Sequence, residues 1–204
     1  MPERNRNEVY DFRLVIGGDS LVLRWPNASR IRVYLNPATN PDLDPLLSES
    51  FRVGSTAWEN AALYGDYQFA HVGAPEQADV IITWSGAVLP VETGQCPQGY
   101  EESFAFTTFC VTPERDRLVP FPLSDSDMAS RVRFLVTIRE SSATNATRVR
   151  SLVVHELGHV LGIVRHSPNS QDLMFADPST RQLPNTRDRV TVQVLYQTTP
   201  AIIP

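Results

Sequence analysis

Three of the four histidines of this 204-residue chain fall within twelve consecutive residues, 155–166. The segment begins with the letters HELGH, which place His155 and His159 four residues apart. On a helix, residues four apart lie about one turn apart on the same face, so both imidazoles can bind one metal ion. Neutral imidazole suits zinc, and Glu156 is close enough to reach a water on the ion without binding the ion itself. We therefore predict a zinc site in which Glu156 is the general base.

The residues around this motif have the spacing of a helix with one buried face. The apolar positions that form a continuous stripe are Val149, Leu152, Val153, Leu157, Val160 and Leu161. Asn145 or Ser142 begins this helix, and Gly162 ends it. An HExxH sequence that had arisen by chance on a solvated surface would not need such a stripe. The pattern therefore favours a zinc-dependent peptidase helix, whose chemistry is peptide hydrolysis by an activated water.

The complete run over 155–166, HELGHVLGIVRH, resembles the HExxHxxGxxH signature of the metzincin clan of zinc peptidases. Within that clan, HELGHVLG followed by HSP at 166–168 is most similar to the matrixins, the matrix-metalloprotease-like branch. The DLMF run at 172–175 resembles the segment that carries the Met-turn, with Met174 as its methionine. The similarity is strong over 147–197, looser over 30–84, and not recognisable between 86 and 130.

The resemblance implies an α+β fold. In that fold a twisted mixed β-sheet packs on a first helix and on the HExxH helix, and a short C-terminal helix follows. It also implies one metallopeptidase catalytic domain over 1–204. That domain would have an N-terminal extension or extra strands over 1–29, an upper sheet-and-helix part over 30–162 and a lower part over 163–204.

One position departs from the metzincin signature. The family places its third histidine where this chain has Arg165, and His166 stands one residue later. A guanidinium stays protonated and does not ligate zinc. Because the helix has ended at Gly162, one extra residue in the following loop still allows His166 to reach the ion. We expect His166 to be the third ligand, with a carboxylate such as Asp172 as the alternative. His71 lies outside every motif, and we expect a surface or packed role for it.

The rest of the chain predicts the mixed sheet and two further helices. Strands are expected at 12–16, 20–25, 30–35, 78–84, 103–111 and 131–139. The apolar run 78–84 predicts a strand buried on both faces, whereas the alternating arginines of 131–139 predict one wet face, as at a sheet edge. Asp44 caps a helix over 45–64 that opens on Pro45, and 185–197 forms the closing helix.

Composition limits the partners of this chain. The net charge is −5, so there is no basic footprint for nucleic acid. No apolar run approaches the roughly 18 to 20 residues that cross a bilayer. We therefore expect a peptide or protein substrate, no nucleic-acid or membrane partner, and a monomer. By the metzincin resemblance, the substrate lies extended along an edge strand above the helix, with a side-chain pocket near 174–184.

The two cysteines, Cys96 and Cys110, bear on where the protein acts. A disulfide between them would close a loop of about 15 residues and stabilise the fold by roughly 3 kcal/mol. Two separate thiols are the alternative. We expect the bond, and with it a secreted or extracytoplasmic protein. Residues 1–10 lack the apolar segment of a signal peptide.

The expected cofactor is one catalytic zinc ion. The family likeness makes structural calcium a further option, although no EF-hand-like loop supports it. Two other hypotheses remain open. The first is a non-catalytic zincin-like module that binds a protein partner and holds a structural zinc, and the presence of Glu156 argues against it. The second is a different zincin clan with a glutamate ligand on a later helix, which the short remainder of the chain disfavours.

Overall fold

The computed structural model describes residues 9–89, 104–111, 118–119, 134–177 and 180–204. Twelve labelled helices and strands follow one another along these residues. They are β1 (Leu14–Ile16), β2 (Asp19–Leu21), β3 (Ser29–Leu35), α1 (Asp44–Glu59), β4 (Tyr67–His71), β5 (Val80–Trp84), β6 (Ala105–Thr108), β7 (Cys110–Val111), β8 (Leu118–Val119), β9 (Phe134–Ile138), α2 (Ala146–Val160) and α3 (Thr186–Gln197).

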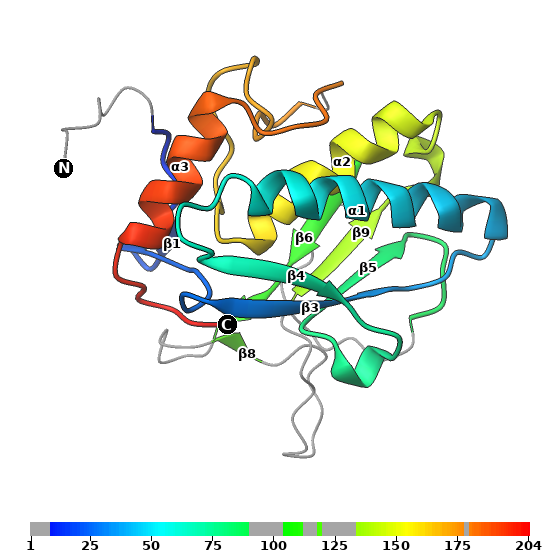
Figure 1. Ribbon diagram of the computed structural model, residues 1–204, viewed down its shortest axis with the longest axis horizontal. Helices are drawn as coiled ribbons and strands as arrows, with labels where there is room; N and C mark the ends of the chain where they lie inside the picture. The colour runs from blue at the N-terminus through cyan, green and yellow to red at the C-terminus, as the bar shows by residue number, and fades with distance from the viewer. Residues whose placement is uncertain (1–8, 90–103, 112–117, 120–133, 178–179) are drawn as a thin grey trace.

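The main sheet has five strands in the order β4-β3-β5-β9-β6. The first four run parallel, and β6 pairs antiparallel with β9 at one edge. Helices α1 and α2 cross this sheet on the same face, and α3 lies to one side of them (Figure 1). The predicted α+β architecture is therefore confirmed. A mixed sheet packs on a first helix and on the HExxH helix, and a short helix follows at the end.

The two central strands are apolar throughout. All five residues of β5 are buried, as the sequence predicts for 78–84. All five residues of β9 are buried as well, so for the described residues of 131–139 the expectation of a wet-faced edge strand is wrong. β6 pairs with β9 and takes the edge position. The second face of β9 is buried because Leu135 packs in a separate apolar cluster with Ala78 and Ile81. The predicted strand 103–111 is divided, because β6 joins the main sheet and β7 pairs with β8.

Helix α1 begins close to the predicted position but is capped differently. Asn40 caps a short 3₁₀ turn at Pro41–Leu43, which leads directly into the helix. The carboxylate of Asp44 accepts a hydrogen bond from the backbone N–H of Ala38, at 2.7 Å, and so fastens the preceding loop. The helix ends at Glu59, earlier than predicted.

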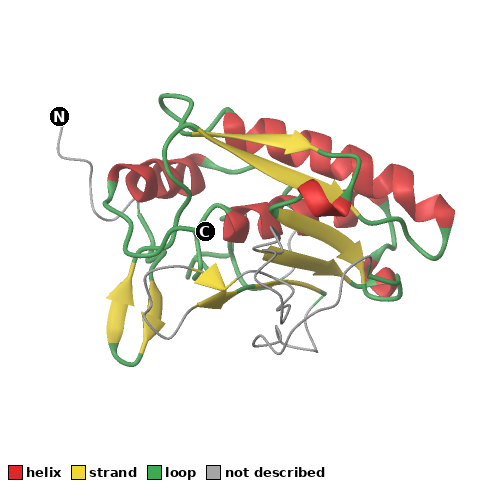
Figure 2. Ribbon diagram, turned by 90° about the horizontal axis from the view of Figure 1, so that it is seen from below, coloured by secondary structure: helices red, strands yellow, loops and turns green. Residues whose placement is uncertain are grey.

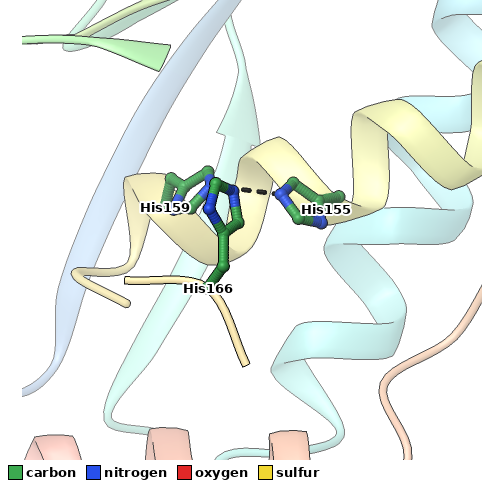
Figure 3. A group of neighbouring side chains, drawn as sticks. All are labelled: His155, His159 and His166. Carbon is green, nitrogen blue, oxygen red and sulfur yellow. Dashed lines mark hydrogen bonds between the residues drawn. The ribbon is translucent and has the colours of Figure 1, made fainter. Parts of the chain in front are cut away.

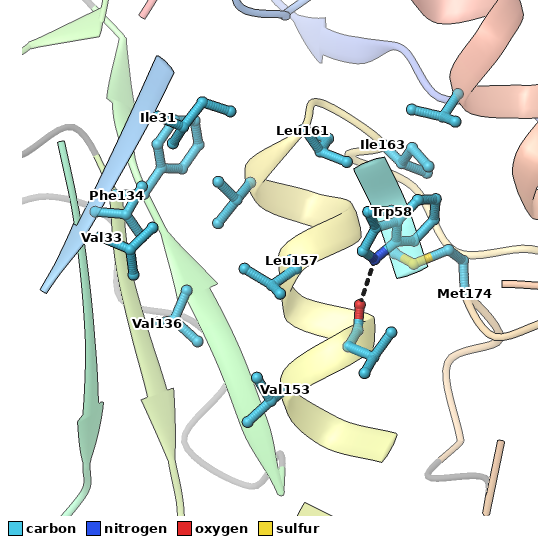
Figure 4. Close-up of a cluster of buried hydrophobic side chains, with 14 of the residues drawn as sticks. Ile31, Val33, Trp58, Phe134, Val136, Val153, Leu157, Leu161, Ile163 and Met174 are labelled. Atoms are coloured by element: carbon cyan, nitrogen blue, oxygen red, sulfur yellow. Dashed lines mark hydrogen bonds between the residues drawn. The ribbon is translucent and has the colours of Figure 1, made fainter. Parts of the chain in front are cut away.

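Helix α2 is packed on both sides. One side faces the sheet, where Val153 and Leu157 lie opposite strand residues including Val33 and Val136 (Figure 4). On the other side, the fully buried Trp58 of α1 donates its indole N–H to the carbonyl of Val154, at 2.8 Å. A second indole, that of Trp25, donates to the carbonyl of Val160 near the end of the helix, also at 2.8 Å.

The terminal segments pack against the same core. Strands β1 and β2 form a hairpin, visible at the lower left of Figure 2, while Tyr10 and Phe12 before it are buried. Leu23 pairs in a parallel bridge with Ile202, which joins residues near the two ends of the described chain. Among the described residues, no helix is long and apolar enough to cross a membrane.

Helix α3 begins as predicted. Asn185 is its N-cap and forms a capping box with Asp188, in which each side chain accepts a hydrogen bond from the other residue's backbone N–H. Asp188 is fully buried, so this carboxylate has contacts beyond the cap itself.

Candidate metal centre

Two of the three clustered histidines project from one face of α2. His155 and His159 are half-buried and one helical turn apart, and their Nε2 atoms approach to 3.1 Å. His166 reaches them from the loop after the helix (Figure 3). The candidate ligand atoms of the three imidazoles all lie within 4.8 Å of one another. Within the described residues this is the only group of three or more histidine, cysteine or acidic side chains with such a spacing.

The rings of the two helical histidines are oriented by backbone carbonyl groups. Nδ1 of His155 lies 2.8 Å from the carbonyl oxygen of Leu173, and Nδ1 of His159 lies 2.6 Å from that of Ile163. A carbonyl oxygen only accepts hydrogen bonds, so Nδ1 must carry the proton in both rings. The lone pair of each neutral ring is therefore on Nε2, and the two Nε2 atoms face each other.

Burial keeps these imidazoles neutral. It lowers the pKa of His155 to about 4. Burial and the neighbouring histidines lower the pKa of His159 well below its usual value, and burial lowers that of His166. Three neutral imidazoles with converging lone pairs are a donor set that suits zinc, and the residues present fit that ion.

Gly162 ends α2 in a Schellman turn. Its N–H donates to the carbonyl of His159 at 3.0 Å, and the next N–H, of Ile163, donates to the carbonyl of Gly158 at 3.1 Å. Gly162 adopts φ +109°, and a Cβ there would overlap the carbonyl oxygen of Leu23. The turn therefore requires glycine, and it places the carbonyl of Ile163 against the ring of His159.

The extra residue in the loop is accommodated by turning Arg165 away from the centre. The guanidinium of Arg165 donates to the carbonyl of Arg13 at 3.1 Å and lies 3.7 Å from the carboxylate of Asp11. His166, the next residue, is the one brought to the other two histidines. The alternative ligand Asp172 is fully buried elsewhere, where it contacts the hydroxyl of Ser167, the Asn185 amide and the Arg187 guanidinium.

Glu156 lies on the buried side of α2, beside the edge strand. Its Oε2 accepts a hydrogen bond of 2.7 Å from the hydroxyl of Thr107 in β6. Burial raises the pKa of this carboxyl to about 7, and the bond from Thr107 partly opposes that rise. The group can therefore gain and lose a proton near neutral pH. The sequence contains no local signal for Thr107, because the contact joins residues 49 apart.

Met174 is fully buried beneath α2. A Cβ on Gly158 would overlap Sδ of Met174 and lie 2.9 Å from Cζ2 of Trp58, so the methionine packs directly under the ligand helix. Asp188 holds this segment, since its carboxylate accepts from the N–H groups of Leu173 at 2.9 Å and Met174 at 3.4 Å.

The remaining sequence predictions fall outside this centre. His71 is exposed at the end of β4, with its ring 6.5 Å from that of Phe51. Cys96 is outside the described residues, so its disulfide with Cys110 stays a prediction. Sequence reasoning did not find Thr107, Asp188 or the hydroxyl of Tyr10, which donates to Asp188 at 2.9 Å. The residues at 185 and 188 have the types of a helix cap, but they do not indicate the further hydrogen bonds of the Asp188 carboxylate.

Comparison with known families identifies the chain. The family model Peptidase_M10, matrixin, matches residues 40–197, which is most of the sequence. The chain belongs to the matrixin family. A matrixin is a zinc metallopeptidase in kind, so the family and the histidine cluster point to the same metal and the same class of reaction.

One solved structure supports the fold of this matrixin, and two others are similar to it at lower TM-scores. The structure of myroilysin superposes with a TM-score of 0.50 at 13% sequence identity, covering 86% of this chain and 83% of that one. A second myroilysin crystal structure has a TM-score of 0.48 at 14% identity, with 86% of each chain covered. Metalloproteinase-II from Bacteroides fragilis has a TM-score of 0.38 at 13% identity, covering 86% of this chain and 55% of that one. No curated protein sequence matches the chain.

Proposed function

We propose that this matrixin is a zinc-dependent endopeptidase with His155, His159 and His166 as the metal ligands and Glu156 as the general base. The observation that carries the proposal is the convergence of three neutral imidazoles beside a buried carboxylate. When bound, zinc would supply Lewis-acid chemistry, which lowers the pKa of water and polarises a carbonyl group. The family and the donor set both support zinc, whereas no observation among the described residues supports the calcium option.

The task of the histidines is to hold the ion in one position. His155 and His159 would bind through Nε2, because Nδ1 of each ring is occupied by a backbone carbonyl. Their lowered pKa values keep the lone pairs available at neutral pH without competition from protons. His166 is exposed, which leaves the third side of the cluster open to solvent and to a substrate.

The task of Glu156 is proton transfer. In its ionised form the carboxylate takes the proton of the attacking water, and in its protonated form it delivers that proton to the departing amine. A pKa near 7 suits both steps. Thr107 binds Oε2 and thereby fixes the orientation of the carboxylate, which leaves Oε1 for the proton.

The substrate is proposed to lie along β6, the edge strand of the main sheet among the described strands. An extended peptide can add to such an edge through backbone hydrogen bonds. Because β6 also carries Thr107, a peptide in this position passes close to Glu156. A peptide that is held along a strand by its backbone does not need a free end, which favours cleavage within a chain over removal of end residues.

We extend the proposal to the domain organisation, oligomeric state, location and partners of the enzyme. Residues 1–204 act as one catalytic domain, the protein works as a monomer outside the cytoplasm, and its partners are peptides or proteins. A gel-filtration measurement of the active protein tests whether it is a monomer.

The test compares the wild type with Glu156→Gln, which keeps the side-chain volume and removes the base. Zinc content by mass spectrometry should stay near one ion per chain in both proteins. Cleavage of casein or of a peptide library should fall by about 100-fold or more in the variant. Glu76→Gln, an exposed site in the 3₁₀ turn at Pro75–Gln77, is the matched control and should cleave normally.

Near wild-type cleavage by Glu156→Gln contradicts the assigned role of Glu156. A wild-type protein that holds zinc but cleaves no peptide contradicts the enzyme proposal and supports the alternative, a protein-binding module with a structural metal.

A further inference from the structure

A pocket of about 410 Å³ opens where β6 begins and α2 starts. Its described lining comes from three separate segments: the residue before β6, the first turn of α2 with the loop before it, and the segment after the Met-turn. These residues are Phe104, Ser141, Ser142, Thr144, Asn145, Thr147, Arg148 and Thr180. Most are small hydroxyl-bearing side chains, and one of them, Arg148, is charged.

Arg148 is the distinctive group in this pocket. Its guanidinium lies 4.5 Å from the centre of the Phe104 ring, which is 45% exposed. Within the described part of the chain no carboxylate pairs with Arg148, and the first turn of α2 has no acidic residue. Glu140, close by in sequence, instead directs its carboxylate at Gly86, where an added Cβ would lie 2.8 Å from Oε1. Among the described residues, the half-buried positive charge of Arg148 therefore has no carboxylate partner.

The pocket lies on the line that a substrate would follow. Arg148 precedes His155 by seven residues, which is two turns of the same helix face and about 10 Å along the axis. On the strand, Phe104 is three residues before Thr107, the partner of Glu156. An extended peptide advances by about 3.3 Å per residue, so the pocket is two to three residues from the bond at the catalytic carboxylate.

The direction of the peptide decides which end of the substrate enters the pocket. Antiparallel strand pairs are the more stable arrangement, and a peptide antiparallel to β6 runs from Thr108 towards Phe104. Its C-terminal part then reaches the pocket. A carboxylate on that part can form two charge-assisted hydrogen bonds with the guanidinium of Arg148, while hydroxyl groups solvate its remaining lone pairs.

We propose that Arg148 selects substrates with an aspartate or glutamate two or three residues after the scissile bond. This inference rests on the proposed peptidase function, because it assumes that the substrate lies along β6. It names the chemical class of the substrate, an acidic peptide, and one residue that determines specificity.

The experiment uses three otherwise identical fluorogenic peptides with Glu, Gln or Lys at the second and third positions after the cleaved bond. Wild-type kcat/KM should be about tenfold higher for Glu than for Gln, and lowest for Lys, and this ratio should shrink as salt is added. In Arg148→Gln the Glu-to-Gln ratio should fall to about one, and in Arg148→Glu the Lys peptide should become the best substrate. Arg52→Gln, at an exposed arginine paired with Glu49 on α1, is the matched control and should keep the wild-type ratio.

Binding measured by calorimetry separates this inference from the proposed function. The Glu peptide should bind the wild type about tenfold more tightly than the Gln peptide, with no such difference in Arg148→Gln, whether or not either peptide is hydrolysed. That binding difference without hydrolysis contradicts the peptidase proposal and supports the role of Arg148 in binding an acidic side chain. Equal binding of the Glu and Gln peptides by the wild type, or an acid preference that persists in Arg148→Gln, overturns the role of Arg148.

Discussion

Replacement of Gly162 by alanine tests the connection between the end of α2 and the metal centre. Gly162 has φ +109°, a backbone conformation that alanine rarely adopts. A Cβ at this position would also overlap the carbonyl oxygen of Leu23, lie 3.0 Å from the carbonyl carbon of Leu23 and lie 3.4 Å from Cα of Arg24. These are backbone atoms, so they cannot move aside as a flexible side chain does.

Gly162→Ala should lower the free energy of unfolding through two effects that add. The left-handed conformation costs alanine about 1 kcal/mol relative to glycine. Relief of the overlap requires a shift of the backbone at Leu23, comparable to overpacking a core, which costs about 1–3 kcal/mol. The total of about 2–4 kcal/mol corresponds to a fall in Tm of roughly 5–15 °C for a protein of this size.

Gly18→Ala is the matched control for that variant. Gly18 lies in the turn between β1 and β2 with φ +91°, and a Cβ there would meet no atom within 4 Å. This substitution should therefore lower the free energy of unfolding by about 1 kcal/mol, the conformational part alone. Urea unfolding followed by circular dichroism, on both variants and the wild type without metal, measures the difference. Equal losses in the two variants would refute the overlap with Leu23.

The same variant should weaken zinc binding. The turn at Gly162 places the carbonyl of Ile163 2.6 Å from Nδ1 of His159, and a shifted turn releases that ring. Loss of a hydrogen bond that orients a metal-binding histidine typically lowers metal affinity by about 10–100-fold. Competition with a chromophoric chelator measures this affinity. Unchanged zinc affinity in Gly162→Ala would show that Ile163 does not orient the ring.

Three more predictions address the surroundings of the centre. His166→Ala should lose most of its zinc, whereas Arg165→Ala should keep it because Arg165 binds the N-terminal segment; metal content decides. Asp188→Asn should lower the free energy of unfolding by about 2 kcal/mol or more and weaken zinc binding, because an amide nitrogen would face backbone N–H groups. Unfolding curves recorded with and without zinc measure both effects. Curves that match those of the wild type would contradict this prediction. Gly158→Ala should lower the free energy of unfolding by about 1–3 kcal/mol in the wild type. The loss should be smaller in a Met174→Ala background, because the overlap with Met174 is then absent, and a double-mutant cycle measures the difference.

The helices could be predicted from the sequence because their signals are local. The apolar stripe and the stop at Gly162 lie within α2 or next to it, and the structure has both where they were predicted. Of the two predicted starts, Asn145 is the cap, whereas Ser142 lies in the 3₁₀ turn before it. The same holds for Asn185 at the start of α3. These features depend on residues only a few positions apart.

The sheet positions were less predictable because strand pairing is not local. The arginines near β9 suggested a wet face at a sheet edge. Its five residues are buried because β6, almost 30 residues earlier in the chain, takes the edge, and because Leu135 packs with Ala78 and Ile81 on the second face. Thr107 contacts Glu156, and Phe104 and Arg148 line one pocket, only because the fold sets β6 beside α2. No spacing within either segment reveals that arrangement.

The metal centre depends on residues outside the HExxH motif as much as on those within it. A helix places His155 and His159 on one face, but the rotation of each ring about its side-chain bonds is set by a carbonyl from another segment. The carbonyl for His155 comes from Leu173, whose own N–H is held by Asp188. The hydroxyl of Tyr10 binds the same carboxylate, so a contact from the N-terminal segment reaches the metal ligand through two hydrogen-bonded groups. An HExxH helix without these supports would present two histidines with no common direction for their lone pairs, and zinc affinity would fall even though every residue of the motif was present.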